Sequence, residues 1–289
     1  MTVAVPSGTS TLPGDTVTRL GRRIAFIKNK GGVGNTFVTI EVGAALARKG
    51  RRVLFVDMDP QGNLSRRLGV PDLDVAITTG EILATKIRGG AASGISRIGW
   101  PIHEATYMQA IPAALSLHDR DGEASIPGSH GRLARTLIDV TDDYDYTLFD
   151  CRPALGHLEQ MVVRALDGDS DGYYTVVEPE ADAVSGAYRV REKVASWADD
   201  MDVTAACLGV IVNRYDDRLV LHKGVTGALS ESLTPDDGGD PPRILLPYIP
   251  LAARMAQLHH LGRASTGDSR AIAEGHIAKF DALADEIDR

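Results

Sequence analysis

Short apolar runs alternate with longer amphipathic stretches along most of the chain. Each run is short enough for a strand buried on both faces, and the stretches between runs carry helical spacing. The runs that predict strands lie at 24–27, 53–56, 108–111, 146–150, 173–177, 207–212 and 244–246. Helices are predicted at 36–49, 132–140, 181–198 and 270–289, and a polar loop at 119–131. This alternation predicts an α/β fold, with a mostly parallel sheet covered by helices on both faces.

The start of the chain departs from this pattern. Residues 1–19 are rich in Ser, Thr, Pro and Gly, and they lack the basic start and apolar centre of a signal peptide. We expect a flexible tail at 1–19 and a single domain at 20–289. No apolar run approaches the length of a transmembrane helix.

Composition and charge narrow the class of protein. The net charge of −8 argues against a broadly basic nucleic-acid-binding surface, although it leaves room for a local basic patch. The two cysteines, Cys151 and Cys207, form no C-x-x-C pair, so neither a disulfide framework nor a cluster site is predicted. This cysteine usage fits a cytoplasmic protein.

A glycine-rich turn joins the first predicted strand to the first predicted helix. Residues 30–36 read Lys-Gly-Gly-Val-Gly-Asn-Thr. Glycines let backbone N–H groups close around an anion, and the following helix points its positive end at the same place. The turn therefore predicts a phosphate-binding loop. It departs from the pattern G-x-x-x-x-G-K-[ST], because Asn29 replaces the first glycine and Asn35 replaces the lysine.

Two other interpretations of this turn are weaker. Gly32-Val33-Gly34 begins the dinucleotide-binding pattern G-x-G-x-x-G, and Asp57 after the next strand could mimic its ribose-binding acid. However, Phe37 stands where the third glycine belongs. The other interpretation is a turn with no ligand, which rarely needs so many glycines.

Two of the predicted strands lead into carboxylates. Residues 57–63 read Asp-Met-Asp-Pro-Gln-Gly-Asn, and Asp150 ends the run at 146–150. An apolar strand that ends in one carboxylate can place it near a phosphate-bound metal ion. After it, Cys151 is expected to be a small structural residue, because no partner for a nucleophile is evident. Arg152 is expected to be a solvated surface residue, with phosphate contact as the alternative.

These segments together resemble the ParA/MinD family of ATPases over about residues 22–285. Lys-Gly-Gly-Val-Gly-x-Thr resembles the deviant Walker A loop, and residues 57–63 resemble the switch I segment. The strand ending in Asp150 resembles Walker B. Asn213-Arg214-Tyr215-Asp216-Asp217-Arg218 and Ile249-Pro250-Leu251-Ala252-Ala253-Arg254 resemble two further family segments.

The resemblance implies a P-loop NTPase that binds ATP and Mg²⁺, with specific residue roles. Asp59 would position the attacking water, and Lys30 would reach across a dimer to the partner's nucleotide. Arg218 and Arg254 would contact DNA. Metal binding would involve Thr36, Asp57 and Asp150. Nucleotide contacts would come from Lys30, Gly31, Gly32, Val33, Gly34, Asn35, Thr36 and Asn213, the last at the adenine edge.

The implied role is that of a small ParA-type ATPase in plasmid or chromosome partition. It would dimerise around nucleotide, bind DNA without sequence preference and be stimulated by a ParB-type centromere-binding protein. We expect a cytoplasmic, nucleoid-associated protein without membrane binding, because the acidic final helix lacks the basic polar face of a MinD-type membrane helix. His259 and His260 are expected on a solvated helix surface.

The residue at position 35, Asn35, leads to alternative predictions of function. A neutral amide in place of the usual lysine predicts weaker ATP binding and slow hydrolysis, and Asn35→Lys would raise both. A hydrolysis-deficient nucleotide-binding scaffold or regulator on the same fold is one alternative. A metabolic P-loop enzyme is the other.

Overall fold

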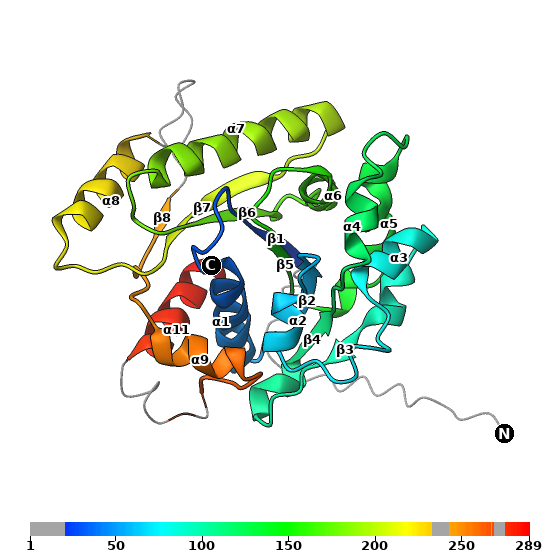
Figure 1. Ribbon diagram of the computed structural model, residues 1–289, viewed down its shortest axis with the longest axis horizontal. Helices are drawn as coiled ribbons and strands as arrows, with labels where there is room; N and C mark the ends of the chain where they lie inside the picture. Colours follow the sequence, from blue (N-terminus) through cyan, green and yellow to red (C-terminus); the bar gives the residue numbers. More distant parts are fainter. Residues whose placement is uncertain (1–20, 233–242, 267, 269–274) are drawn as a thin grey trace.

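A central β-sheet organises the computed structural model, which describes residues 21–232, 243–266, 268 and 275–289 (Figure 1). Within these residues the sheet has eight strands in the order β3-β4-β2-β5-β1-β6-β7-β8. All neighbouring strands are parallel except β3 and β4. The strands are β1 Arg22–Ile27, β2 Val53–Met58, β3 Ser96–Arg97, β4 Met108–Ile111, β5 Tyr146–Cys151, β6 Gly172–Val177, β7 Ala206–Val212 and β8 Ile244–Leu245.

Helices cover both faces of the sheet (Figure 1). One face carries α1 Asn35–Arg48, α2 Asn63–Arg67, α9 Ala253–His260 and α11 His276–Ile287. The other face carries α3 Thr79–Thr85, α4 Leu117–Asp121, α5 Arg132–Leu137, α6 His157–Ala165 and α7 Ala183–Met201. Helix α8 Val220–Ser232 packs against α7. The predicted α/β class, with a mostly parallel sheet between two helical layers, is confirmed.

The central strand β1 shows why the apolar runs are continuous. Ile24 and Phe26 pack into the core on the α1 side, whereas Ala25 and Ile27 pack into the core on the α6 side. All four side chains are fully buried. A strand with a hydrophobic layer on each face cannot alternate apolar and polar residues, so its sequence becomes an uninterrupted apolar run.

The predicted strands are all present, and their ends differ from the prediction by at most two residues. The polar loop predicted at 119–131 is wrong at its start, because α4 begins at Leu117 and buries that side chain completely. Helix α5 ends at Leu137 rather than at 140, and Asp139 adopts a left-handed backbone with φ of 64°. The expected tail at 1–19 lies outside the described residues, as does most of 270–275 in the predicted last helix.

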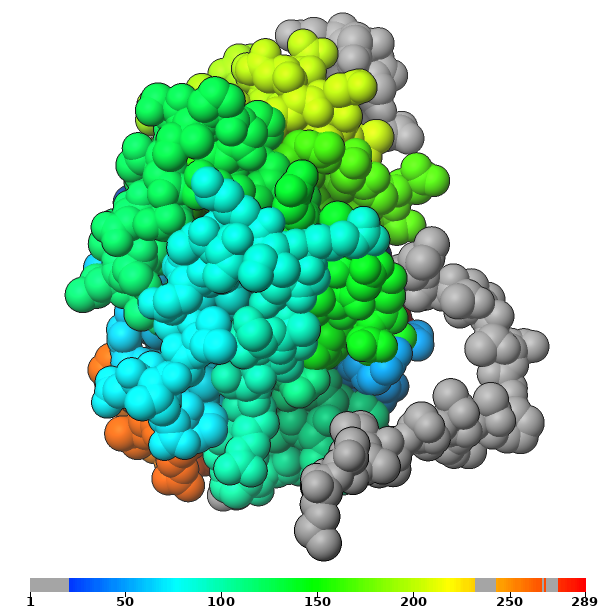
Figure 2. Space-filling view, turned by 90° about the vertical axis from the view of Figure 1, so that its right-hand side faces the viewer, coloured from blue at the N-terminus to red at the C-terminus, as the bar shows by residue number. Residues whose placement is uncertain are grey.

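The β3 end of the sheet is covered by the chain from α3 to α5. Figure 2 looks onto this side, where the cyan and green parts of the chain form a continuous surface.

Among the described residues, no helix is both long and apolar enough to cross a membrane. At the opposite end of the molecule in Figure 1, α7 and α8 lie along β6 to β8.

The parallel strands bring the predicted functional segments together. In a parallel sheet the carboxyl ends of neighbouring strands lie at one edge, and ligands bind outside that edge. The loops after β1, β2, β5 and β7 all leave the sheet there. Asp57 of β2 lies directly beside Asp150 of β5 in the strand register.

Candidate nucleotide-binding site

The glycine-rich turn wraps directly into the N-terminus of α1. Gly32 and Gly34 have φ of 89° and 84°, a left-handed conformation that side chains rarely allow. A Cβ on Gly34 would also lie 2.3 Å from the Asn213 side-chain nitrogen. Gly34 immediately precedes the helix, and its carbonyl accepts the Val38 N–H at 2.9 Å. Glycine is therefore required where the loop becomes the positive end of a helix.

A cavity of about 330 Å³ opens beside this loop. Gly31, Gly32, Gly34, Asn35, Thr36, Asp59 and Asn213, all predicted from the sequence, line this cavity. The prediction missed other members of the wall. These are Lys28, Phe37, Asn63, Arg67, Pro153, Arg214, Leu251, Ala252 and Ala256. Of these residues, Lys28 could have been predicted from the sequence, because it is a cation that lies between a buried strand and the glycines.

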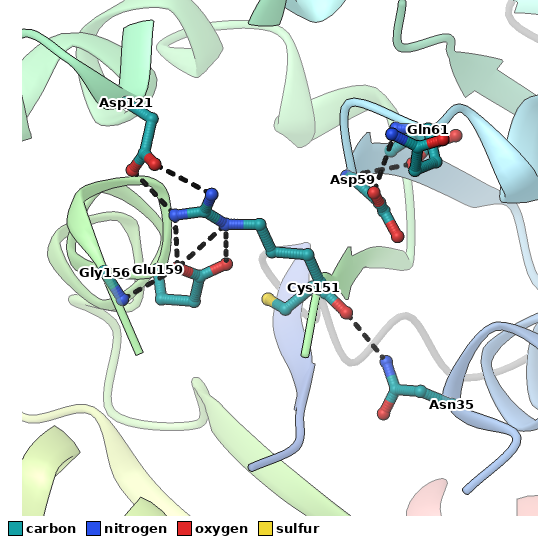
Figure 3. Close-up of polar contacts among 9 residues, drawn as sticks. Asn35, Asp59, Gln61, Asp121, Cys151, Gly156 and Glu159 are labelled. Atoms are coloured by element: carbon teal, nitrogen blue, oxygen red, sulfur yellow. Dashed lines mark hydrogen bonds and ion pairs between the residues drawn. The ribbon is translucent and has the colours of Figure 1, made fainter. Parts of the chain in front are cut away.

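The Asn35 side chain turns inward rather than toward the cavity. Its Nδ2 group donates to the Phe26 carbonyl at 3.0 Å and to Asp150 Oδ1 at 2.7 Å. A longer contact of 3.4 Å reaches the Cys151 carbonyl (Figure 3). The residue is only 2% exposed, and its Oδ1 has no hydrogen-bond partner among the described residues. The amide thus ties α1 to β1 and β5, and its donor is already in use.

Thr36 and Asp150 form the part of the site suited to a metal ion. The Thr36 hydroxyl donates to Asp150 Oδ2 at 2.6 Å, and both residues are buried. Burial raises the pKa of Asp150, while the ammonium of Lys28 and the hydrogen bond from Thr36 lower it. A hydroxyl and a carboxylate at the start of the helix after a phosphate-binding loop are suitable oxygen ligands for Mg²⁺.

Asp57 and Asp59 have different surroundings although they are two residues apart. Asp57 is fully buried and accepts hydrogen bonds from the Ser65 hydroxyl at 2.6 Å, the Ser65 N–H at 3.0 Å and the Asp59 N–H at 3.1 Å. Burial and the neighbouring charge of Asp150 raise the pKa of Asp57 to about 7. Asp59 lines the cavity and accepts the Gln61 N–H at 2.9 Å (Figure 3). Asp57 therefore organises the loop from behind, while Asp59 lies at the cavity.

Lys30 lies away from the cavity wall in this single chain. Its ammonium is 2.5 Å from Glu180 and 3.3 Å from Asp182, and its side chain is 49% exposed. Asn213 is buried and donates from Nδ2 to the Val33 carbonyl at 2.8 Å, so it supports the loop. The amide donor that was expected to contact the adenine edge is thus used within the protein.

The two arginines expected to contact DNA are both paired with carboxylates of their own chain. Arg218 is 84% exposed and contacts both carboxylate oxygens of Asp216, at 2.9 and 2.6 Å. Arg254 is 35% exposed and lies 2.5 Å from Asp268. Contact with a phosphate backbone would require each arginine to exchange its present partner.

Two expectations about nearby residues are wrong. Arg152 is neither solvated nor part of the cavity wall, because its guanidinium lies 2.7 Å from Asp121 and 3.2 Å from Glu159. These two carboxylates are labelled in Figure 3. His259 is completely buried, with Nε2 2.7 Å from Glu41, because it shares the inner face of α9 with Met255. His260 is exposed, as expected.

Cys151 fits its predicted structural role. It is fully buried at the end of β5, and burial raises the pKa of its thiol well above the usual range. A thiol that does not ionise is a poor nucleophile.

Comparisons with known proteins agree with this geometry. Residues 21–203 match the family model described as an AAA domain. The chain is 33% identical over 201 residues to the sporulation initiation inhibitor protein Soj of Bacillus subtilis, covering 69% of this chain and 75% of Soj. It is 36% identical over 212 residues to an uncharacterised protein of Mycobacterium tuberculosis, covering 72% of this chain and 63% of that relative. The present chain therefore spans less than two thirds of the mycobacterial protein.

The fold has a close counterpart among solved structures. The ATP complex of a Cyanothece McdA variant superposes with a TM-score of 0.75 at 21% identity, covering 93% of this chain and 96% of that one. At this identity the likeness concerns the fold alone. Together with the extent of the family match and the identity to Soj, it leads to one assignment: the chain belongs to the ParA/MinD family of P-loop ATPases.

Proposed function

We propose that this chain is a ParA-type partition ATPase that binds ATP with Mg²⁺ and acts on DNA as a nucleotide-dependent dimer. One observation carries the proposal most directly. Glycines of the loop, Thr36 and Asp59 line one cavity, and Thr36 donates to the buried Asp150 behind it. The similarity to Soj supports a role in partition, and the ATP bound to the McdA variant supports the choice of nucleotide.

The residues around the cavity divide the chemical work. Backbone N–H groups of residues 31–36 and the N-terminus of α1 would bind the phosphates. Thr36 and Asp150 would hold Mg²⁺, which neutralises phosphate charge as the bond to the γ-phosphate breaks. Asp59 would orient the attacking water, and Asp57 would hold the Asp59 loop through Ser65. Phosphoryl transfer depends mainly on such positioning and charge stabilisation.

Dimerisation would change the partners of Lys30. In the single chain the half-exposed Lys30 side chain forms ion pairs with Glu180 and Asp182. Surface ion pairs of this kind are weak, so a partner's phosphate could replace them. Arg218 and Arg254 would bind the DNA backbone without reading sequence. A ParB-type protein would stimulate hydrolysis, and binding to chromosomal DNA would place the protein on the nucleoid.

Asn35 supports slow turnover. Its amide is held by Phe26 and Asp150, and it adds no charge to the phosphate site. Loss of one preorganised group of this type elsewhere costs on the order of 10²–10³ in rate. The same observation favours a second candidate function, a nucleotide-binding scaffold or regulator that does not hydrolyse ATP.

The test measures binding and hydrolysis separately. Mg²⁺-ATP binding is followed by isothermal titration, and phosphate release is measured with and without DNA. Binding together with slow, DNA-stimulated release supports the partition ATPase. Binding without release above the rate of buffer favours the scaffold, and no binding of ATP contradicts both.

A further inference from the structure

Lys28 is a largely buried cation in the wall of the cavity. It follows the last residue of β1, and it is only 6% exposed. Its ammonium makes no hydrogen bond or ion pair with any residue in the described part of the chain. Lysines are almost never this buried unless they are paired, because removing an unpaired charge from water is costly. An anion bound in the cavity would satisfy this group.

The position of Lys28 indicates which anion this is. Lys28 lines the same cavity as the glycine loop and Thr36, on the wall that continues from β1. Burial raises the pKa of Asp150 and the positive charge of Lys28 opposes this rise, so the ammonium acts on the carboxylate that Thr36 contacts. Lys28 therefore shares the cavity wall with the loop glycines and with Thr36.

Asn35 provides the second observation. The usual loop pattern has a lysine at this position, whereas here the amide faces Phe26 and Asp150 and is buried. A neutral residue has therefore taken the place beside Asp150, and a lysine stands seven positions earlier, at the end of the neighbouring strand. Position 35 therefore offers no charge to the cavity, whereas Lys28 in the same cavity wall carries one.

We propose that Lys28 binds the terminal phosphates of the nucleotide and replaces the lysine that is missing at position 35. The inference rests on the proposed function, since it names a further phosphate-binding residue of that site. Arg67 is the competing cation in the cavity wall. It is the last residue of α2, and burial lowers the pKa of its guanidinium.

The test exchanges the two side chains. Lys28→Asn should weaken Mg²⁺-ATP binding by about 10- to 100-fold, the range expected for one charge-assisted hydrogen bond. Asn35→Lys alone should improve binding by less than about threefold, because the pocket already holds one ammonium and a second would repel it. The double variant Lys28→Asn/Asn35→Lys should bind within about threefold of the wild type.

Stability and a matched variant complete the design. Lys28→Asn should unfold at the same temperature as the nucleotide-free wild type or above it, since an unpaired buried charge is removed. Arg67→Gln is the control cation and should change ATP affinity less than Lys28→Asn does. The inference is overturned if the wild type binds ATP and Lys28→Asn binds it equally well. It is also overturned if the double variant binds ATP as weakly as Lys28→Asn does, or if Arg67→Gln lowers ATP affinity more than Lys28→Asn does. Absence of ATP binding by the wild type would instead overturn the proposed function, and this inference with it.

Discussion

Removal of one partner from the buried pair Glu41–His259 is expected to destabilise the fold strongly, and His259→Leu tests this. Glu41 lies on α1 and His259 on α9, and the two side chains are 1% and 0% exposed. His259 Nε2 lies 2.7 Å from Glu41 Oε1, and the Ser265 hydroxyl donates to the same oxygen at 2.5 Å. The imidazole also stacks on Trp100, with the ring centroids 5.5 Å apart.

Leucine at position 259 would remove the nitrogen donor and leave the Glu41 carboxylate buried. Removal of the partner of a buried charge costs about 3–5 kcal/mol, and here the Glu41 carboxylate would keep the Ser265 hydroxyl as a donor but lose the imidazole. For a chain of this size each kcal/mol lowers the melting temperature by about 2–4 °C, so we expect a fall of roughly 10 °C. His260→Leu, the same change at the exposed neighbour, is the matched control and should shift the midpoint by about 1 °C or less.

The double variant Glu41→Met/His259→Leu separates charge from packing. Replacement of both partners by apolar side chains should recover most of the loss, to within about 1–2 kcal/mol of the wild type. The difference between wild type and His259→Leu should also shrink as the pH falls. The hydrogen bond from His259 holds the pKa of Glu41 below its usual value of 4.5, against the effect of burial. Without it the pKa rises, so the variant's carboxylate is neutralised at higher pH and its penalty is removed.

The assays are thermal and urea unfolding of the nucleotide-free chain at pH 7 and pH 5, both followed by circular dichroism. A loss below about 1 kcal/mol for His259→Leu at pH 7 would show that water or rearranged groups replace the imidazole. A double variant no more stable than the single one would show that packing around the His259 ring, rather than the Glu41 charge, determines the cost.

Three further outcomes are expected. Lys30→Ala should abolish the ATP-dependent dimer in sedimentation velocity, whereas Glu180→Gln, which removes the partner at 2.5 Å, should preserve or strengthen it; an undiminished dimer in Lys30→Ala would contradict the role in trans. The variant Arg218→Ala/Arg254→Ala should weaken ATP-dependent binding equally for unrelated DNA sequences and reduce its salt dependence, as measured by fluorescence anisotropy, and unchanged binding would remove these arginines from the DNA surface. The raised pKa of Asp57, about 7 in the folded chain against about 3.9 when unfolded, means that the folded state holds an extra proton between these values. The free energy of unfolding without metal should therefore fall by up to about 4 kcal/mol as pH rises from 4 to 7, and Asp57→Asn should lack this contribution; a contribution of the opposite sign would refute it.

The sequence predicted the sheet well because both of its faces are buried. Runs such as 146–150 are too apolar for a surface position, and their length restricts them to strands. Helices α2, α3, α6 and α8 were not predicted; α2 and α3 have only five and seven residues, two turns or less, which is too short for a clear helical period. Helix α4 was taken for a loop because its polar residues outnumber the single buried anchor, Leu117.

The candidate site could be predicted where backbone geometry determines it. Gly32 and Gly34 are explained by their left-handed conformations, and Thr36 and Asp150 by their places after the loop and at the end of β5. Long-range pairing could not be predicted, because the partner of a charged residue depends on tertiary packing. For example, Arg152 pairs with Asp121, 31 residues earlier.

The role of buried histidine was also beyond the sequence pattern. His259 pairs with Glu41, which lies more than 200 residues earlier in the chain. His259 and His260 are identical neighbours in the sequence, although the ring of His259 is buried and that of His260 is exposed. Only the orientation of α9 against α1 distinguishes the two.

Phosphate release from Mg²⁺-ATP, measured for the wild type and Asp59→Ala with and without DNA, tests the central claim most directly. Asp59 lines the cavity from the loop after β2, which is separate from the glycine loop, so Asp59→Ala should bind ATP normally in titration. The account predicts slow release by the wild type that DNA increases, and no release above buffer by Asp59→Ala. Equal release by both proteins, or release by neither despite full ATP binding, would contradict the assignment of a partition ATPase with Asp59 at its catalytic water.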